Sequence, residues 1–232
     1  MKPILFVTAT VKEMKAALGG VCVLPELKQG RPVSFKFAGR PGILLVTGIG
    51  VINVSFALGQ TLAKNDVGEV LLAGVAGTFA PDSFPIGSAC TVRTEIWPEY
   101  GLKTGDNVDP KGLGFSLAEI DGNPVWDRME LRSGKSLMNS GLDRLAKLPE
   151  AISLTVSGVT ATADGADRFR NEFAADIENM EGFAAAYACA LSGVEVCQVR
   201  TVSNLVGSRD SKDWDLRGAL AELGRVCSVL IK

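Results

Sequence analysis

The sequence predicts an α/β fold with three layers (α/β/α), in which helices cover both faces of a central, mixed and twisted β-sheet. Short apolar runs typical of buried strands alternate with stretches of helical periodicity along the 232 residues. Several of these runs also end at glycines that come directly before a helical stretch. No repeat, low-complexity tract or linker divides the chain, so we expect one domain over residues 1–232.

The N-terminal half is predicted to supply most of the strands. Ile4–Thr8 is a short apolar run typical of a buried strand, and the stretch Thr10–Met14 indicates the start of a helix. Val33–Phe37 alternates as an exposed strand does, whereas Gly42–Thr47 is continuously apolar and predicts a buried strand. The remaining elements of this half are a helix near Val51–Leu62 and strands at Glu69–Ala73 and Ser88–Thr94.

The C-terminal half continues the alternation after a segment, from about Glu95 to Lys147, that is rich in Gly, Asp and Pro and is the least predictable. The expected strands are Ile152–Ser157 and Val194–Val202, and the expected helices are Ala166–Phe173 and the Ala-rich Met180–Leu191. Trp214–Ile231 is predicted to close the chain as a helix. Its buried stripe is expected to contain Leu216, Leu220, Leu223, Val226 and Leu230.

Composition and charge exclude several classes of function. The 24 basic and 26 acidic residues give a net charge of −2, which leaves no basic excess to follow nucleic-acid phosphates. No run approaches the roughly 18 apolar residues of a membrane span, and the N-terminus lacks the apolar core of a signal peptide. Five scattered cysteines without a C-x-x-C pair indicate reduced thiols, which predicts a cytoplasmic protein.

The chain contains no histidine, which removes Ser-His and Cys-His catalysis and histidine-ligated metals. Acid–base chemistry must then depend on carboxylates, amides, lysines, tyrosines or thiols. Gly48–Asn53 begins like a dinucleotide-binding fingerprint, but Asn53 occupies the place of the third glycine, and no P-loop motif occurs. We therefore expect neither a cofactor nor a metal ion.

Four short segments together resemble the nucleoside phosphorylase and nucleosidase superfamily. They are Thr8–Met14, Gly74–Gly77, Glu178–Gly182 and Arg200–Asn204, and their order and spacing match over nearly the whole chain. Within that superfamily the chain resembles the futalosine hydrolases of menaquinone biosynthesis. These similarly carry Glu-Asn-Met-Glu-Gly, then Ser-Asn with a Gly-x-Arg-Asp loop, here Gly207–Asp210.

The resemblance implies a nucleoside phosphorylase-like fold and hydrolysis of the purine–ribose bond of futalosine, giving hypoxanthine and dehypoxanthine futalosine. Such cleavage develops positive charge on the ribose, which nearby carboxylates stabilise, and one carboxylate takes the proton of the attacking water. By resemblance, Glu13 is that base, and Glu181 binds the ribose hydroxyls. Met180 packs against the sugar, and Arg200 anchors the water and the carboxylates. Taken singly, Glu13 would be an exposed first-turn glutamate favoured by the helix dipole.

Asn204 carries the inference about the base. Adenine nucleosidases of this superfamily have an aspartate at the matching position, and a carboxylate suits a 6-aminopurine. A 6-oxopurine protonated at N7 offers a donor at N7 and an acceptor at O6, which an amide complements with its carbonyl and NH₂ groups. A buried mismatch costs roughly 1–3 kcal/mol per unsatisfied group. Asn204 therefore favours hypoxanthine or guanine, although an Asn in a turn before Gly207 is a serious alternative.

Water is predicted to be the nucleophile rather than phosphate. Related hexameric phosphorylases bind phosphate through an arginine and a serine near the strand that matches Glu69–Val75. Here Leu71–Val75 contains neither a cation nor a hydroxyl group, so a bound phosphate would lack its counter-charge. The chain departs from the adenine nucleosidases at Val75, where those enzymes have a serine.

The resemblance also assigns several contacts with weaker support. Ala76, Gly77 and Ser203 are expected to touch the substrate, and Thr162 lies in a loop that contacts the base in relatives. Trp214 matches an aromatic residue on the 5′ side of the sugar, with a core residue as an equal alternative. Futalosine ends its 5′ arm in a benzoate, which Arg209 could meet, but a surface arginine beside Asp210 is the preferred reading.

Two rival functions stay open. One is a nucleosidase for 5′-methylthioadenosine/S-adenosylhomocysteine or for inosine, which relative release of adenine and hypoxanthine would separate. The other is a non-catalytic purine-binding protein of the same fold, against which the presence of both Glu13 and Glu181 argues. The expected partner is a small-molecule purine nucleoside, with no nucleic acid and no membrane. The resemblance implies a homodimer or a larger homo-oligomer.

Overall fold

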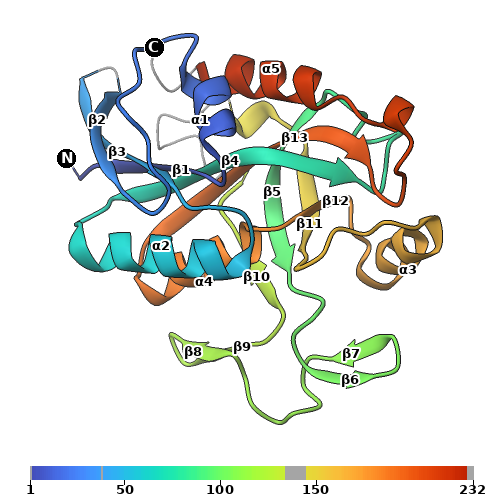
Figure 1. Cartoon of the computed structure of the whole chain (residues 1–232). Coiled ribbons are helices and arrows are strands. Elements are labelled where there is room, and N and C mark those ends of the chain that lie inside the picture. Colours follow the sequence, from blue (N-terminus) through green and yellow to red (C-terminus); the bar gives the residue numbers. More distant parts are fainter. Residues whose placement is uncertain (1, 38, 134–144, 229–232) are drawn as a thin grey trace.

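The computed structural model describes residues 2–37, 39–133 and 145–228, and a nine-stranded mixed sheet forms its centre (Figure 1). The strands of this sheet are β1 (Ile4–Thr8), β2 (Val33–Phe37), β3 (Arg40–Val46), β4 (Glu69–Thr78), β5 (Ala89–Ile96), β10 (Arg128–Glu130), β11 (Glu150–Thr155), β12 (Ile177–Asn179) and β13 (Glu195–Leu205). β3, β1 and β4 run parallel, while β2 pairs antiparallel with β3 at one edge. The predicted mixed sheet is confirmed.

Helices cover both faces of the sheet, as the sequence predicts (Figure 1). They are α1 (Val11–Leu18), α2 (Val51–Lys64), α3 (Ala163–Phe173), α4 (Gly182–Leu191) and α5 (Leu216–Cys227), with short 3-10 turns at Leu145–Lys147 and Ser211–Asp213. The alternation of β1 explains the layers. Ile4 and Phe6 join the cluster that contains α1 and α5, and Leu5 and Val7 join the cluster that contains α2 and α4.

The sheet closes on itself at one end, which the sequence did not predict. β13 pairs with β4 and β5, β5 pairs with β11, β11 with β12, and β12 returns to β4. Closure depends on β12, a strand of three residues whose pairing is entirely long-range. The ring brings residues of β4 beside residues of β12 and β13 that come about a hundred positions or more later in the chain.

Several predicted elements have different bounds. β4 continues to Thr78 beyond its predicted end at Ala73, and β13 continues to Leu205 beyond its predicted end at Val202. The helix expected from Met180 begins at Gly182, because the side-chain carbonyl of Asn179 accepts hydrogen bonds from the backbone N–H groups of Glu181 and Gly182. The last helix buries the predicted leucine and valine stripe except for half-exposed Leu216, while Leu230 lies outside the described residues.

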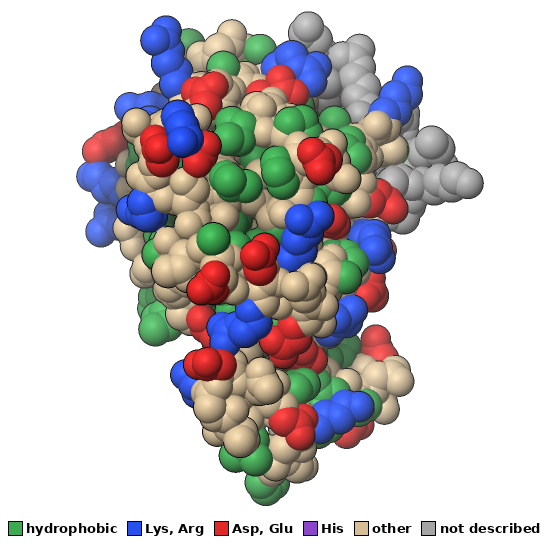
Figure 2. Space-filling model, turned by 90° about the vertical axis from the view of Figure 1, so that its right-hand side faces the viewer, with side chains coloured by type: hydrophobic (Ala, Val, Ile, Leu, Met, Phe, Trp, Pro, Cys, Tyr) green, Lys and Arg blue, Asp and Glu red, His purple; other side chains and the backbone are tan. Residues whose placement is uncertain are grey.

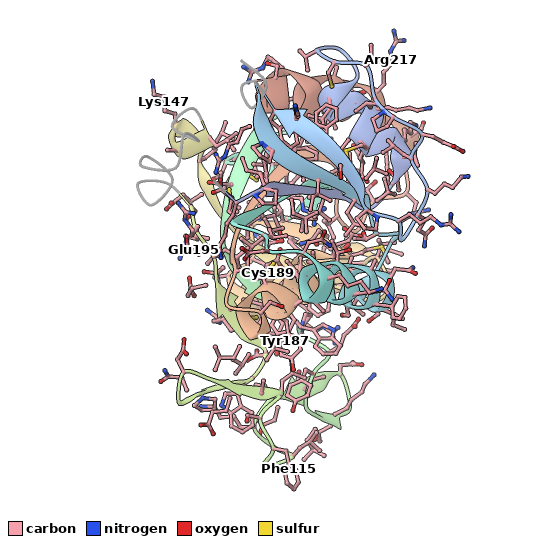
Figure 3. All side chains as sticks on the ribbon, turned by 90° about the vertical axis from the view of Figure 1, so that its left-hand side faces the viewer. Phe115, Lys147, Tyr187, Cys189, Glu195 and Arg217 are labelled. Carbon is pink, nitrogen blue, oxygen red and sulfur yellow. The ribbon has the colours of Figure 1, made fainter. Side chains whose placement is uncertain are left out.

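Residues 97–127 form an extension that projects from the body (Figure 1). It contains two hairpins, built from β6 (Leu102–Thr104) with β7 (Asn107–Asp109) and β8 (Ala118–Ile120) with β9 (Asn123–Val125). Figure 3 shows Phe115 near the tip and Tyr187 where the extension meets the body. There the Tyr187 hydroxyl donates a hydrogen bond to the Leu117 carbonyl over 3.2 Å.

The surface agrees with the modest net charge. Figure 2 shows acidic and basic side chains interspersed over one face of the molecule, without a continuous basic track. No helix in the described residues has the length and apolar character needed to span a bilayer.

Candidate active site

A cavity of about 370 Å³ opens where the ends of β4, β12 and β13 meet the start of α1. Most of the residues that the sequence singles out line this cavity: Glu13, Ala76, Gly77, Met180, Glu181, Ser203, Asn204, Arg209 and Trp214. Thr10, Thr160 and Glu178 line it too, although the sequence reasoning gave them no role. Residues from both ends of the chain therefore share one concave site.

Glu13 is a buried carboxylate held by the first turn of α1. Thr10 and Glu13 form a capping box, in which the Thr10 hydroxyl accepts from the Glu13 N–H and Glu13 Oε2 accepts from the Thr10 N–H over 2.9 Å. Its other oxygen, Oε1, accepts from the Val75 N–H over 3.2 Å. The side chain is 6% exposed, so the solvent-exposed alternative for Glu13 does not apply.

Glu181 and Arg200 form a buried ion pair beside Glu13. Arg200 Nη1 lies 3.2 Å from Glu181 Oε2, and both side chains are buried. Glu181 Oε1 accepts from the Gly50 N–H, so the glycine turn before α2 contributes to the site through its backbone. Arg200 also donates to the Val75 carbonyl over 3.1 Å.

Gly74 lies directly under the place where Glu13 and Arg200 approach each other. A Cβ atom added at Gly74 would lie 2.8 Å from both Glu13 Oε1 and Arg200 Nη1. A side chain at position 74 would therefore separate these two groups. Arg200 forms its ion pair with Glu181, and its charge also lowers the pKa of Glu13.

Burial raises the pKa of Glu13 above its ordinary value, and the charge of Glu181 raises it further. The hydrogen bonds from Thr10 and the charge of Arg200 act in the opposite direction. A carboxyl group whose pKa is raised in this way is better suited to accept a proton than an exposed glutamate.

Asn179 and Glu95 form a buried network behind the ion pair, and the sequence reasoning assigned neither a role. Asn179 Oδ1 accepts from Arg200 Nη2 over 2.9 Å, while its Nδ2 donates to Glu95 Oε1 over 2.8 Å. Glu95 also accepts from Thr155 and Gln198. Burial raises the pKa of Glu95, and Arg200 opposes that shift. Glu95 escaped notice because it begins the segment that the sequence left unassigned.

Asn204 faces the cavity from a bulge in β13. The register with β4 shifts between Val202 and Asn204, which places Asn204 opposite Gly77. Ser203 Oγ lies 2.8 Å from Asn204 Oδ1, and Asn204 Nδ2 donates to the Leu205 carbonyl over 3.3 Å. These contacts fix the orientation of the amide, and Asn204 is part of a strand rather than a turn.

Glu178 reaches the cavity from the other side of Gly77. It is 6% exposed, and Thr160 donates to it through both its backbone N–H, over 3.0 Å to Oε1, and its hydroxyl group. Burial raises the pKa of Glu178 above its ordinary value.

Thr162, which the sequence proposed as a contact, is exposed and caps α3 by accepting from the Gly165 N–H. Thr160 and its neighbour Val159 are the residues of this loop that line the cavity.

Trp214 and Arg209 lie together at the cavity. The Arg209 guanidinium lies 5.3 Å from the centre of the Trp214 ring, and Trp214 Nε1 donates to the Ser208 carbonyl. Trp214 is half-exposed and lines the cavity, so it is not a core residue. Asp210 pairs with Lys212 at 3.1 Å, and among the described residues Arg209 has no carboxylate partner.

Metal and thiol chemistry have no site in the described part of the chain. No group of three or more His, Cys, Asp or Glu side chains there is arranged to hold a metal ion. The cysteines are unpaired, and burial raises the pKa of Cys90, Cys189, Cys197 and Cys227 to about 12. These four thiols are poor nucleophiles near neutral pH.

Comparison with known proteins agrees with this geometry. The family model of the phosphorylase superfamily matches residues 3–231. A futalosine hydrolase of Thermus thermophilus is 34% identical over 207 residues, covering 88% of each chain, and one of Streptomyces coelicolor is 33% identical, covering 69% of this chain and 66% of that protein. The fold is similar to that of a Helicobacter pylori nucleosidase mutant with 5′-methylthioadenosine in its active site, with a TM-score of 0.79, 19% identity, and 100% and 98% of the two chains covered.

Proposed function

The chain belongs to the phosphorylase superfamily, and we propose that it is an N-ribosyl hydrolase that releases hypoxanthine from futalosine. The observation that carries this proposal is the arrangement of the cavity. It combines two buried carboxylates at one end, Glu13 and the Glu181 that pairs with Arg200, with an oriented amide, Asn204, at the other. Cleavage of a nucleoside requires a group that binds the departing base and charges that stabilise the positive ribose, and the two ends of the cavity supply these.

At the ribose end, Glu13 takes the proton of the attacking water. Its pKa, raised by burial, suits that role, and the Val75 N–H and Thr10 hold its carboxylate in place. Glu181, already oriented by Arg200 and the Gly50 N–H, binds the ribose hydroxyls, and Met180 packs against the sugar. Negative charge at this end stabilises the oxocarbenium character of the transition state.

At the base end, Asn204 serves N7 and O6 of the 6-oxopurine. Ser203 and the Leu205 carbonyl restrict the rotation of its amide, so the group is oriented before the substrate arrives. As the glycosidic bond breaks, its electron pair goes to the base, and N7 takes a proton from solvent water; the N7–H then donates to the amide carbonyl, while the amide NH₂ donates to O6. Ala76 and Gly77 form the wall of the cavity beside Ser203 and Asn204.

Water is the nucleophile. The buried cation of the site, Arg200, directs Nη1 and Nη2 to the Val75 carbonyl, Glu181 and Asn179. Arg200 is not among the residues that line the cavity, and Glu13 and Glu181, which do line it, would repel a phosphate. The cavity wall at Val75 provides no hydroxyl group either.

The 5′ arm of the substrate extends past Trp214 toward Arg209. Arg209 lines the cavity and stacks on Trp214, while the neighbouring Asp210 is paired with Lys212. A guanidinium without a carboxylate partner among the described residues is suited to bind the benzoate of futalosine. Arg209 is also exposed beside Asp210, as the preferred reading of the sequence has it, so its contact with the substrate stays a proposal.

A second candidate function is cleavage of an adenine nucleoside such as 5′-methylthioadenosine. The fold likeness to a nucleosidase with that ligand in its active site favours it. Comparing rates of adenine and hypoxanthine release from nucleosides with the same 5′ group separates the two functions. Asn204 supports the 6-oxopurine, because its amide complements both N7–H and O6.

We also propose that the protein is a cytoplasmic homodimer or larger homo-oligomer. The unpaired, mostly buried cysteines fit a reducing compartment. Ile49, Ile52 and Phe56 are large apolar side chains exposed at the start of α2, and Ile49 also lines the cavity. Burial against a second copy would cover these side chains beside the site, and sedimentation analysis measures that association directly.

The experiment that tests the proposed function is hydrolysis by a Glu13→Gln variant. We expect the wild-type protein to release hypoxanthine from futalosine in phosphate-free buffer, and the variant to lose at least about 100-fold in kcat, the usual contribution of a general base. Glu26→Gln is the matched control, because the Glu26 side chain is 79% exposed and lies outside the cavity. Wild-type turnover by Glu13→Gln would disprove the role of Glu13.

A further inference from the structure

Glu178 is a carboxylate in the cavity that the proposed mechanism does not use. It is buried, and burial raises the pKa of this side chain. Among the described residues no lysine or arginine forms a salt bridge with it. A buried carboxylate without a cation is costly, so its place in the cavity calls for a function.

Strand register places Glu178 and Asn204 on opposite sides of Gly77. Gly77 of β4 pairs with Asn204 of β13 on one side and with Glu178 of β12 on the other. Residues in register on neighbouring strands direct their side chains to the same face of a sheet. Two strand spacings separate Asn204 and Glu178, so their Cα atoms are about 10 Å apart with a glycine between them. All three residues line the cavity of about 370 Å³, and this cavity is the space for a flat ring with one polar group at each end.

The hydrogen bonds of Glu178 leave acceptor capacity directed at that space. Two carboxylate oxygens offer about four lone-pair sites, and Thr160 uses one on each oxygen. Each oxygen thus keeps a free site for another donor. The amide of Asn204 has no group left for a third polar atom of the base, because its carbonyl and its NH₂ serve N7 and O6.

A 6-oxopurine carries one further polar group next to O6, the N1–H donor. Adenine has a bare nitrogen at N1, which accepts hydrogen bonds and repels a carboxylate. N7, O6 and N1–H follow one another along one edge of hypoxanthine, as Asn204, Gly77 and Glu178 follow one another across the three strands. We propose that Glu178, oriented by Thr160, accepts the N1–H of the base and determines selectivity for a 6-oxopurine over a 6-aminopurine.

This inference rests on the proposed function for the identity of the substrate, but base binding tests it separately. In Glu178→Gln, the Gln carbonyl can still accept from the Thr160 N–H, and the Thr160 hydroxyl can reverse to accept from the new NH₂ group. The variant therefore keeps its local hydrogen bonds and presents a donor, the second N–H of the amide, at one of the two positions where Glu178 offers an acceptor. We expect the ratio of the Kd of adenine to the Kd of hypoxanthine to fall at least tenfold relative to wild type.

The matched control is Glu99→Gln. Glu99 accepts from the N–H and hydroxyl of Ser157, the same kind of contact that Glu178 makes with Thr160, but it does not line the cavity. The ratio should stay within twofold of wild type in this control. Calorimetric titration of each full-length protein with hypoxanthine and with adenine gives the ratios, and thermal unfolding establishes that each variant is folded.

The outcomes separate the two proposals. An unchanged ratio in Glu178→Gln overturns the role of Glu178, even if the wild-type protein cleaves futalosine. Failure of the wild-type protein to bind hypoxanthine more tightly than adenine overturns it as well. Selective hypoxanthine binding that Glu178→Gln reverses, in a protein that leaves futalosine intact, supports the role of Glu178 and rejects the proposed function.

Discussion

At the scale of single residues, Gly74 controls how closely the charged groups of the site approach. We expect Gly74→Ala to reduce kcat for hypoxanthine release at least tenfold, because the new Cβ would separate Glu13 from Arg200. Overpacking of this kind also costs about 1–3 kcal/mol of stability. Steady-state kinetics and urea unfolding measure the two effects.

The matched control for this change is Gly59→Ala in α2. A Cβ at Gly59 meets nothing within 4 Å, and replacing a glycine within a helix by alanine stabilises it by about 0.5–1 kcal/mol. Activity equal to wild type in Gly74→Ala would mean that the spacing between Glu13 and Arg200 is irrelevant to catalysis.

The identity of the polar residues of the site was partly predictable at this scale. Glu13, Glu181 and Asn204 stand out in the sequence through short motifs, and the structure places all three in one cavity. Glu178 lies within one of those motifs, but the pairing of β12 with β4 determines that its side chain faces the cavity. Thr162 was chosen over Thr160 because sequence alone does not fix where α3 begins.

At the scale of elements, the junction between β12 and α4 holds the site together through Asn179. Its carbonyl oxygen accepts from Glu181, Gly182 and Arg200, and its NH₂ donates to Glu95. We expect Asn179→Ala to lower the free energy of unfolding by at least about 2 kcal/mol, because several buried polar groups lose their partner. Activity should also fall, since Arg200 loses one of its anchors.

Asn171→Ala is the control for the junction. Asn171 lies on the exposed surface of α3, and its removal should change the free energy of unfolding by less than about 0.5 kcal/mol. Urea denaturation of both variants gives the comparison. Equal stability of Asn179→Ala and Asn171→Ala would show that the network does not hold the junction.

The elements themselves differ in how far local sequence determines them. β1 and β2 have the predicted bounds, because short apolar or alternating runs between polar residues define them locally. β4 and β13 extend beyond their apolar cores, since pairing with each other carries both strands through glycine and polar residues. β12 was not predicted, because its three residues become a strand only through partners from distant segments.

At the scale of the whole molecule, the three-layer architecture follows from the alternation of apolar runs and helices, and the closure of the sheet does not. Closure nonetheless creates the cavity, by bringing β12 beside β4 opposite β13. In the proposed mechanism, the carboxylate end of this site binds the ribose, and the end with Asn204 and Glu178 binds the base. The central claim is that water attacks a purine nucleoside held between these two ends.

Transfer of oxygen from solvent tests that claim most directly. Futalosine is incubated with the protein in H₂¹⁸O, with and without phosphate, and both products are analysed by mass spectrometry. We predict free hypoxanthine at the same rate in both buffers, with one ¹⁸O atom in the ribose-containing product. A phosphorylated sugar, dependence on phosphate, or absence of any cleavage would contradict the account.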